Sequence, residues 1–162
     1  MKTKLFIVSI CLLFLSIVYG FNSYSSNTLK NEILIRAFID SWNKHDINKL
    51  ISLFSENCLY EVIADGGSFS SKEQIAAYAK STFSGIPDTE MIIVKIVAND
   101  SIGVVEWIWK GTNSVGWPNL GITPTNKHFE VRGISIMEIE NGLIKQNRDY
   151  WDWNTFIKGI SN

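Results

Sequence analysis

The stretch from Lys127 to Trp153, KHFEVRGISIMEIENGLIKQNRDYWDW, decides how the rest of the chain is interpreted. Two runs of alternating apolar side chains flank Asn141-Gly142, a dipeptide that strongly favours a β-hairpin turn. The second run ends in Arg148-Asp149-Tyr150-Trp151-Asp152, which places two carboxylates among aromatic side chains. Because burying a carboxylate costs free energy, this segment either caps the next element or forms the floor of a pocket that contains a titratable group.

Alternation along the second strand predicts which side chains share a face with Asp149. One face would hold Lys145, Asn147, Asp149 and Trp151, and the other Ile144, Gln146, Arg148, Tyr150 and Asp152. Asp149 and its neighbour Arg148 would therefore point apart. A two-residue turn would place Ile134 opposite Asp149, whereas a three-residue loop with a glycine bulge would place Ser135 there. The sequence leaves both registers open.

The predicted role of Asp149 follows from its apolar surroundings. A position beside Trp151 would raise the pKa of the carboxyl and allow it to act as a general acid or base near neutral pH. The alternative is a structural carboxylate that pairs with Arg132 of the preceding strand. Asp152 directly precedes the last predicted helix, and we expect it to cap that helix.

Apolar periodicity predicts three helices before the strands. The first is capped by Asn27 or Thr28 and carries the stripe Leu29, Ile33, Ala37, Phe38, Ser41 and Trp42. The second is capped by Asp46, buries Ile47, Leu50, Ile51 and Phe54, and ends at Ser55-Glu56-Asn57. The third begins at Ser70 or Ser71, buries Ile75, Ala76, Ala79 and Phe83, and stops at Gly85-Ile86-Pro87.

Runs of strand-forming residues complete the predicted order. The segments are a strand Cys58–Ala64, a turn Asp65-Gly66-Gly67, strands Met91–Ala98 and Ile102–Gly111, a long loop Thr112–Thr125, the hairpin, and a final helix Asn154–Gly159. Helices on one side of an antiparallel sheet give a single α+β domain. A loop as long as the one before the hairpin often covers a site.

The first twenty residues have the pattern of a signal peptide. Lys2 and Lys4 precede the apolar run Leu5–Tyr19, and we expect cleavage near Gly20. An uncleaved anchor is the alternative, although the run is shorter than the roughly 20 residues that span a bilayer. Residues 21–27 read as a flexible lead, and 28–162 as the domain. The predicted location is therefore periplasmic or secreted, with no membrane association after cleavage.

Composition excludes several classes of function. The 15 Lys and Arg residues less Lys2 and Lys4 leave 13 against 16 Asp and Glu, a net charge of −3 after cleavage. No basic stripe is present, so nucleic-acid binding is not expected. Cys58 lies in an apolar run and is interpreted as a buried thiol without a role. The two histidines lack neighbours at metal-ligand spacing, and no nucleophile elbow or nucleotide-binding loop is present, so neither a metal nor a cofactor is expected.

Six tryptophans in a chain of this length favour a flat apolar cavity. Trp107 and Trp109 share one face of their strand, and Trp117 lies in the long loop. The residues expected to line the cavity are Trp42, Tyr60, Trp107, Trp109, Trp117, Ser135 and Trp151, around a catalytic Asp149. The expected partner is a small apolar or aromatic ligand.

Several motifs resemble the SnoaL-like polyketide cyclase family, which belongs to the nuclear transport factor 2-like and ketosteroid-isomerase-like superfamily. They are the helix segment Ala37–Asn43, the strand end Gly111-Thr112, the segment Pro124–Phe129, and Ile139–Ile144 followed by Arg148–Asp152. The resemblance spans about 29–160. It implies a curved antiparallel sheet that forms a cone with the N-terminal helices, a deep apolar pocket, and a homodimer formed through the sheet.

The resemblance also implies a chemistry. Cyclases of this family close a ring by an intramolecular aldol step, with an aspartate as general acid and base and without a cofactor. That aspartate corresponds to Asp149. Other polar positions of the family are replaced: a tyrosine by Trp42, an asparagine by Ile75, and two histidines by Ser135 and Asn113.

The sequence is compatible with three functions. The preferred one is a cofactor-independent cyclase- or isomerase-type enzyme acting on a carbonyl or enol substrate. The second is a non-catalytic protein that binds a small ligand in the same pocket. The third is an interaction module whose functional surface is the sheet.

Overall fold

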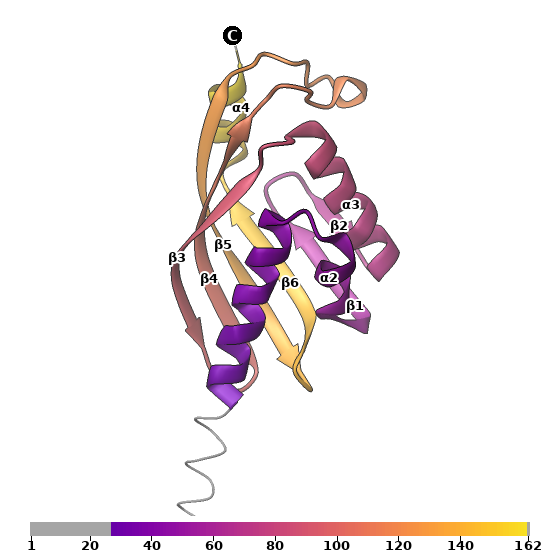
Figure 1. The fold of residues 1–162 in the computed structure, drawn as a ribbon, viewed down its shortest axis with the longest axis vertical. Coiled ribbons are helices and arrows are strands. Elements are labelled where there is room, and N and C mark those ends of the chain that lie inside the picture. Colours follow the sequence, from indigo (N-terminus) through magenta and orange to yellow (C-terminus); the bar gives the residue numbers. More distant parts are fainter. Residues whose placement is uncertain (1–26, 162) are drawn as a thin grey trace, which may run out of the picture.

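Six strands form one curved sheet in the order β2-β1-β6-β5-β4-β3 in the computed structural model, which describes residues 27–161 (Figure 1). The strands are β1 Phe54–Val62, β2 Gly67–Phe69, β3 Glu90–Ala98, β4 Ile102–Thr112, β5 His128–Glu140 and β6 Leu143–Trp151. The helical segments are residues 27–43, α2 Ile47–Ser52, α3 Lys72–Gly85, the 3-10 turn η1 Pro118–Leu120, and α4 Trp153–Ile160. This is the predicted α+β class. The predicted signal peptide and most of the flexible lead lie outside the described residues.

The hairpin of β5 and β6 combines features of both predicted registers. Asn141 and Gly142 form a two-residue turn with φ values of 53° and 75°, as a type I′ turn requires. A bulge near Lys145 then shifts the pairing by one residue, so Ser135 and not Ile134 lies opposite Asp149. The same bulge overturns part of the predicted face assignment: Ile144 is buried in the core and Lys145 is exposed.

The N-terminal helix crosses the sheet on the same side as α2 and α3 (Figure 1). Its buried stripe consists of Asn31, Leu34, Ile35, Phe38, Ile39, Ser41 and Trp42. The predicted stripe was therefore wrong at Leu29 and Ile33, which are each 59% exposed. The burial of large side chains at later positions sets the rotation of the helix. The predicted cap was also wrong, because Asn27 and Thr28 are already helical.

Strand β1 begins earlier than predicted. Asp46 caps α2 by accepting a hydrogen bond from the Lys49 amide, as expected, but the helix ends at Ser52, and Ser55-Glu56-Asn57 lies within the strand. β1 pairs in parallel with β6, and the short strand β2 adds to its other edge in antiparallel orientation. Neither the parallel pairing nor β2 was predicted.

The helix α3 and the loop between β4 and β5 are joined at Gly85. A Cβ atom at this position would lie 2.3 Å from the Trp117 ring, so only glycine lets the indole pack here. The Trp117 indole N–H also donates to the Ser81 carbonyl oxygen at 3.0 Å. This part of the loop is therefore anchored on α3.

The helix α4 closes the end of the sheet where this loop lies (Figure 1). Asp152 caps it as predicted, accepting from the amides of Asn154 and Thr155. Phe156 and Ile160 pack on Phe129 and Val131 of β5, forming a second core cluster beside the main one. Within residues 27–161 no helix is both long and apolar enough to cross a membrane.

Candidate functional site

The carboxylate of Asp149 lies on the inner face of β6 and is held by three neutral donors. Tyr60 of β1 donates its hydroxyl to Oδ2 at 2.5 Å. Ser135 of β5 donates its hydroxyl to Oδ1 at 2.6 Å, and the Asn147 amide donates to the same oxygen at 2.8 Å. A carboxylate offers about four acceptor positions, so one remains on Oδ2 for a substrate.

A second layer of contacts orients Ser135. The indole N–H of Trp107 on β4 donates to the Ser135 hydroxyl oxygen at 2.8 Å, so the hydroxyl proton is directed to Asp149. Gly133 makes this arrangement possible, because a Cβ atom there would lie 2.3 Å from the Trp107 ring. The register of three strands thus fixes the donors around the acid.

Burial raises the pKa of the Asp149 carboxyl above its ordinary value. The hydrogen bonds from Ser135, Tyr60 and Asn147 act in the opposite direction, and the negative charge of Asp65 adds to the rise. Burial also raises the pKa of Tyr60 well above its ordinary value, with the Asp149 charge as the second cause. Tyr60 therefore stays protonated and keeps donating to Asp149.

Asp149 faces a small cavity of about 40 Å³. Its walls are mainly aromatic and come from six separate segments: Trp42, Tyr60, Tyr78, Thr82, Thr89, Met91, Trp107, Trp109, Asp149 and Trp151. The volume exceeds the 10 to 15 Å³ or so that one water requires. The reacting end of a ligand can therefore approach the carboxylate.

A larger cavity of about 890 Å³ adjoins the small one and shares with it the walls formed by Tyr78, Thr82, Trp109 and Trp151. It lies between the turn after β1, helix α3, the loop before β5 and helix α4. Its other lining residues are Ala64, Asp65, Gly66, Gly67, Phe69, Ser81, Trp117, Leu120, Gly121, Ile122, Trp153, Phe156 and Ile157. The volume falls within the range of small-molecule sites.

The indole of Trp42 contributes an unused hydrogen-bond donor. The residue is 5% exposed, and its ring lies against Phe83 and Tyr78 with centroid distances of 5.4 and 5.9 Å. Among the described residues, its N–H has no acceptor. Because an unsatisfied buried donor is costly, a polar atom of a ligand beside Trp42 would be stabilised.

The predicted site residues come together around these two cavities. Trp42, Tyr60, Trp107 and Asp149 line the small one, Trp109 and Trp151 line both, and Trp117 lines the large one. Ser135 lines neither, because it lies behind the carboxylate that it contacts. The proposed structural pairing of Asp149 with Arg132 is absent, since Arg132 pairs with Glu106 at 3.1 Å. The roles of these residues stay predictions.

Sequence reasoning missed several residues of the site. Asn147 was placed on the face of Asp149 but not recognised as its donor, although their two-residue spacing signals it. Tyr78 was missed although it follows the buried Ile75 by one helical turn. Trp153 and Phe156 lie on a short helix whose position depends on the tertiary fold, and no local signal identifies them.

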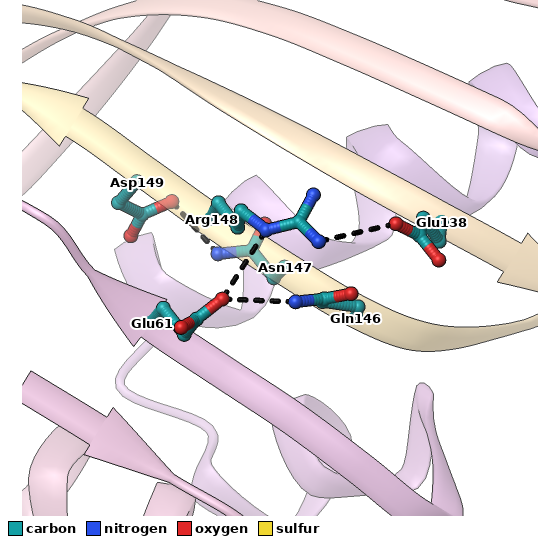
Figure 2. Close-up of polar contacts among 6 residues, drawn as sticks. All are labelled: Glu61, Glu138, Gln146, Asn147, Arg148 and Asp149. Carbon is teal, nitrogen blue, oxygen red and sulfur yellow. Dashed lines mark hydrogen bonds and ion pairs between the residues drawn. The ribbon is translucent and has the colours of Figure 1, made fainter.

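The opposite face of β6 carries a different polar network. Figure 2 shows Arg148 reaching Glu61 of β1 and Glu138 of β5, while the adjacent Asp149 bonds to Asn147. Both contacts of Arg148 measure 3.2 Å. Gln146 also donates to Glu61, at 2.9 Å. Arg148 and Asp149 therefore do not neutralise one another. This agrees with the prediction, from the alternation of side chains along the strand, that the two point apart.

Metal and thiol chemistry find no support within residues 27–161. No group of three His, Cys, Asp or Glu side chains is placed to hold a metal ion there. Cys58 is buried, and burial raises the pKa of its thiol, which disfavours the reactive thiolate.

Several solved structures share this fold. A proposed SnoaL-like polyketide cyclase from Jannaschia sp. CCS1 is 17% identical with a TM-score of 0.75, covering 83% of this chain and 93% of that one. IdmH from Streptomyces antibioticus, a proposed polyketide cyclase, is 18% identical with a TM-score of 0.69, covering 79% and 96%. A ketosteroid isomerase-like protein from Catenulispora acidiphila, solved with trimethylamine, is 20% identical with a TM-score of 0.68, covering 78% and 91%.

These identities are low, so the structures establish the fold alone. No curated protein matches the chain. Residues 32–158, however, match the family described as SnoaL-like polyketide cyclase. That match spans most of the chain and includes the hairpin, Asp149 and the aromatic walls of both cavities. The chain therefore belongs to the SnoaL-like polyketide cyclase family.

Proposed function

We propose that this protein is a cofactor-independent enzyme of cyclase or isomerase type that moves a proton on a carbonyl or enol substrate. The observation that carries the proposal is the carboxylate of Asp149, 7% exposed and held by neutral donors at the base of an aromatic cavity. Among residues 27–161, no cationic side chain pairs with this carboxylate. A carboxyl with a raised pKa suits proton transfer near neutral pH.

In the proposed reaction, Asp149 first accepts a proton from the substrate and later donates it back. The free acceptor position on Oδ2 removes a proton from the carbon next to the substrate carbonyl, and an enolate forms. The N–H of Trp42 donates to the carbonyl oxygen as negative charge develops there. In an isomerisation, the protonated Asp149 returns the proton to another carbon of the substrate. In an intramolecular aldol step, the enolate carbon bonds to a second carbonyl carbon of the substrate, the π electron pair of that carbonyl moves to its oxygen, and Asp149 protonates the resulting alkoxide. The proton balance of the enzyme is restored.

The test does not require the natural substrate. A panel of 1,3-dicarbonyl and β,γ-unsaturated ketones is incubated with the protein in deuterated water, and deuterium incorporation next to the carbonyl is followed by NMR. We expect protein-dependent exchange that falls by about 10²- to 10⁴-fold in Asp149→Asn. Arg148→Gln, which changes the adjacent residue on the outer face, is the matched control and retains exchange. Equal exchange by Asp149→Asn and the unaltered protein would refute the proposal.

A second candidate is a binding protein without catalysis. The observation in its favour is that Asp149 already accepts three hydrogen bonds, while Trp42 and Ile75 replace polar side chains of the family. The same variant separates the two functions. Ligand affinity retained by both proteins, with no exchange by either, supports the binding protein.

Location and assembly extend the proposal. We propose that the protein is exported after cleavage of its leader near Gly20 and that it forms a homodimer through the sheet, as the resemblance implies. The N-terminal sequence of the mature protein and its mass in solution test these two points.

A further inference from the structure

Aromatic side chains line the large cavity on several sides. Trp117 comes from the loop before β5, Trp151 from the end of β6, Trp153 and Phe156 from α4, and Phe69 from β2. The rings are held in fixed relative positions: the centroids of Trp151 and Trp153 are 5.7 Å apart, and those of Trp153 and Phe156 are 5.6 Å apart. Ring faces carry partial negative charge and attract cations.

Three side-chain donors of the cavity are used by the protein itself, whereas those of Tyr78, Ser81, Trp151 and Trp153 donate no hydrogen bond within the described residues. The indole N–H of Trp117 is bound by Ser81, and that of Trp109 donates to the Thr89 hydroxyl at 2.6 Å. The Thr82 hydroxyl donates to the Tyr78 carbonyl at 3.1 Å. The donors of Thr82, Trp109 and Trp117 are therefore not free for an anionic ligand group.

The backbone of the two lining turns is engaged in the same way. In the turn after β1, the Gly66 amide donates to the Val62 carbonyl at 3.0 Å and the Gly67 amide to Asp65 Oδ1 at 2.9 Å. In the loop, the amides of Gly121 and Ile122 donate to the carbonyls of Pro118 and Trp117, both at 3.1 Å. Neither turn forms the cluster of free amides that binds anions.

The charge of the lining is negative. Asp65 is the charged residue among the lining residues of the large cavity, which include no Lys, Arg or His within the described chain. Its charge reaches the smaller cavity as well, since it is among the causes that raise the pKa of Asp149, Tyr60 and Tyr78. The free carboxylate oxygen of Asp65 is an acceptor at the mouth of the aromatic cavity.

We infer that the large cavity recognises an organic cation: a substrate whose aromatic or alkyl skeleton carries an ammonium group, seated against the indoles with its charge near Asp65. The inference rests on the proposed function and deepens it by naming the charge class of the substrate. The carbonyl end of such a molecule would enter the small cavity beside Asp149.

The test uses three probes that share a phenyl ring with a tetrahedral head and differ in charge. They are phenyltrimethylammonium, tert-butylbenzene and benzenesulfonate. Affinities are obtained from the chemical shifts of the indole N–H signals of the nitrogen-15-labelled protein. We expect the cation to bind about tenfold more tightly than its neutral isostere, and the sulfonate to bind most weakly.

Variants assign the preference to the cavity. In Asp65→Asn we expect the cation-to-neutral ratio to fall about threefold, because a partly solvated charge contributes modestly. Asp100→Asn removes another exposed carboxylate, at the β3–β4 turn, and leaves the ratio unchanged. Trp153→Leu, which keeps an apolar side chain but removes the ring face, lowers affinity for the cation more than for tert-butylbenzene.

Three results would overturn the inference: equal affinities for cation and neutral probe, tighter binding of the sulfonate, or an unchanged ratio in Asp65→Asn. Indole signals that no probe shifts would overturn it as well. These outcomes are distinct from failure of the proposed function, which the exchange assay with Asp149→Asn measures without any charged ligand.

Discussion

Arg148 and Asp149 are adjacent in sequence and lie in opposite electrostatic environments on the two faces of β6. Arg148 is partly solvated and is balanced by the carboxylates of Glu61 and Glu138 (Figure 2). Asp149 is buried, and its carboxylate accepts hydrogen bonds from the neutral groups of Tyr60, Ser135 and Asn147. The outer network neutralises charge with charge, whereas the inner one leaves a carboxyl whose protonation can change.

The difference shows how the two faces of one strand place charged groups under different physical constraints. A half-exposed ion pair contributes little free energy, because water already solvates both partners. A buried carboxyl with neutral donors has a raised pKa, and its donors depend on it for their own hydrogen bonds. Substitutions on the two faces should therefore differ in size and in their dependence on pH.

The largest effect on stability is expected for Asp149→Leu. Leucine has a similar shape but accepts no hydrogen bond, so the donors of Tyr60, Ser135 and Asn147 lose their partner in a buried site. We expect the free energy of unfolding to fall by roughly 3 kcal/mol, given about 1 to 3 kcal/mol for each unsatisfied buried group and a gain from removing the carboxyl. Urea unfolding measures the loss, and a decrease below that of Arg148→Met would contradict the account.

A smaller effect is expected for Tyr60→Phe. The ring and its aromatic contacts remain, while Asp149 Oδ2 loses its donor, at a cost of about 1 to 2 kcal/mol in unfolding free energy at neutral pH. Because that hydrogen bond lowers the pKa of Asp149, its loss should also move the acid limb of the exchange activity to higher pH. Tyr150→Phe, on the outer face, is the matched control. If the acid limb of the pH–activity profile did not move in Tyr60→Phe, the hydrogen bond from Tyr60 would not lower the pKa of Asp149.

A third prediction concerns the pH dependence of stability. The folded protein binds the Asp149 proton more tightly than the unfolded chain does, since burial raises the carboxyl's pKa above 3.8. Stability from this group is therefore lost as pH rises from 3.8 through the folded pKa. Asp149→Asn does not titrate, so its melting temperature relative to the unaltered protein should climb by a few degrees over this range and then level off. A difference that falls with rising pH would contradict the sign.

The smallest effect is expected for Arg148→Met on the outer face. Its contacts with Glu61 and Glu138 are partly solvated, so the free energy of unfolding should change by less than about 1 kcal/mol. The change should shrink further at high salt, where charges near the surface are screened. A loss as large as that of Tyr60→Phe would show that the two faces do not differ as described.

The sequence predicts the elements that depend on local chemistry. Asn141-Gly142 predicts the turn, Asp152 and Asp46 predict their helix caps, and alternation correctly separates Arg148 from Asp149. Each of these rests on residues within a few positions of one another. The α+β class and the resemblance to the family follow from the same local patterns, and the family match confirms them.

Features set by tertiary contacts could not be predicted in this way. The bulge near Lys145 lies where β6 meets both β5 and the parallel strand β1, and it decides that Ser135 faces Asp149. Leu29 and Ile33 fit a helical stripe equally well, but the burial of Phe38 and Trp42 turns them outward. The cavity walls come from segments that are distant in the sequence. The position of Trp153 in the site therefore depends on how α4 packs against the sheet, which no local pattern predicts.

The most direct test of the account is a carboxyl carbon-13 NMR titration of Asp149, assigned by the signal that disappears in Asp149→Asn. We predict a midpoint above the ordinary value of 3.8 that coincides with the acid limb of the exchange activity. A midpoint at or below 3.8 would contradict the account, because the hydrogen bonds from Ser135, Tyr60 and Asn147 would then outweigh burial and leave a carboxylate that is only a weak base.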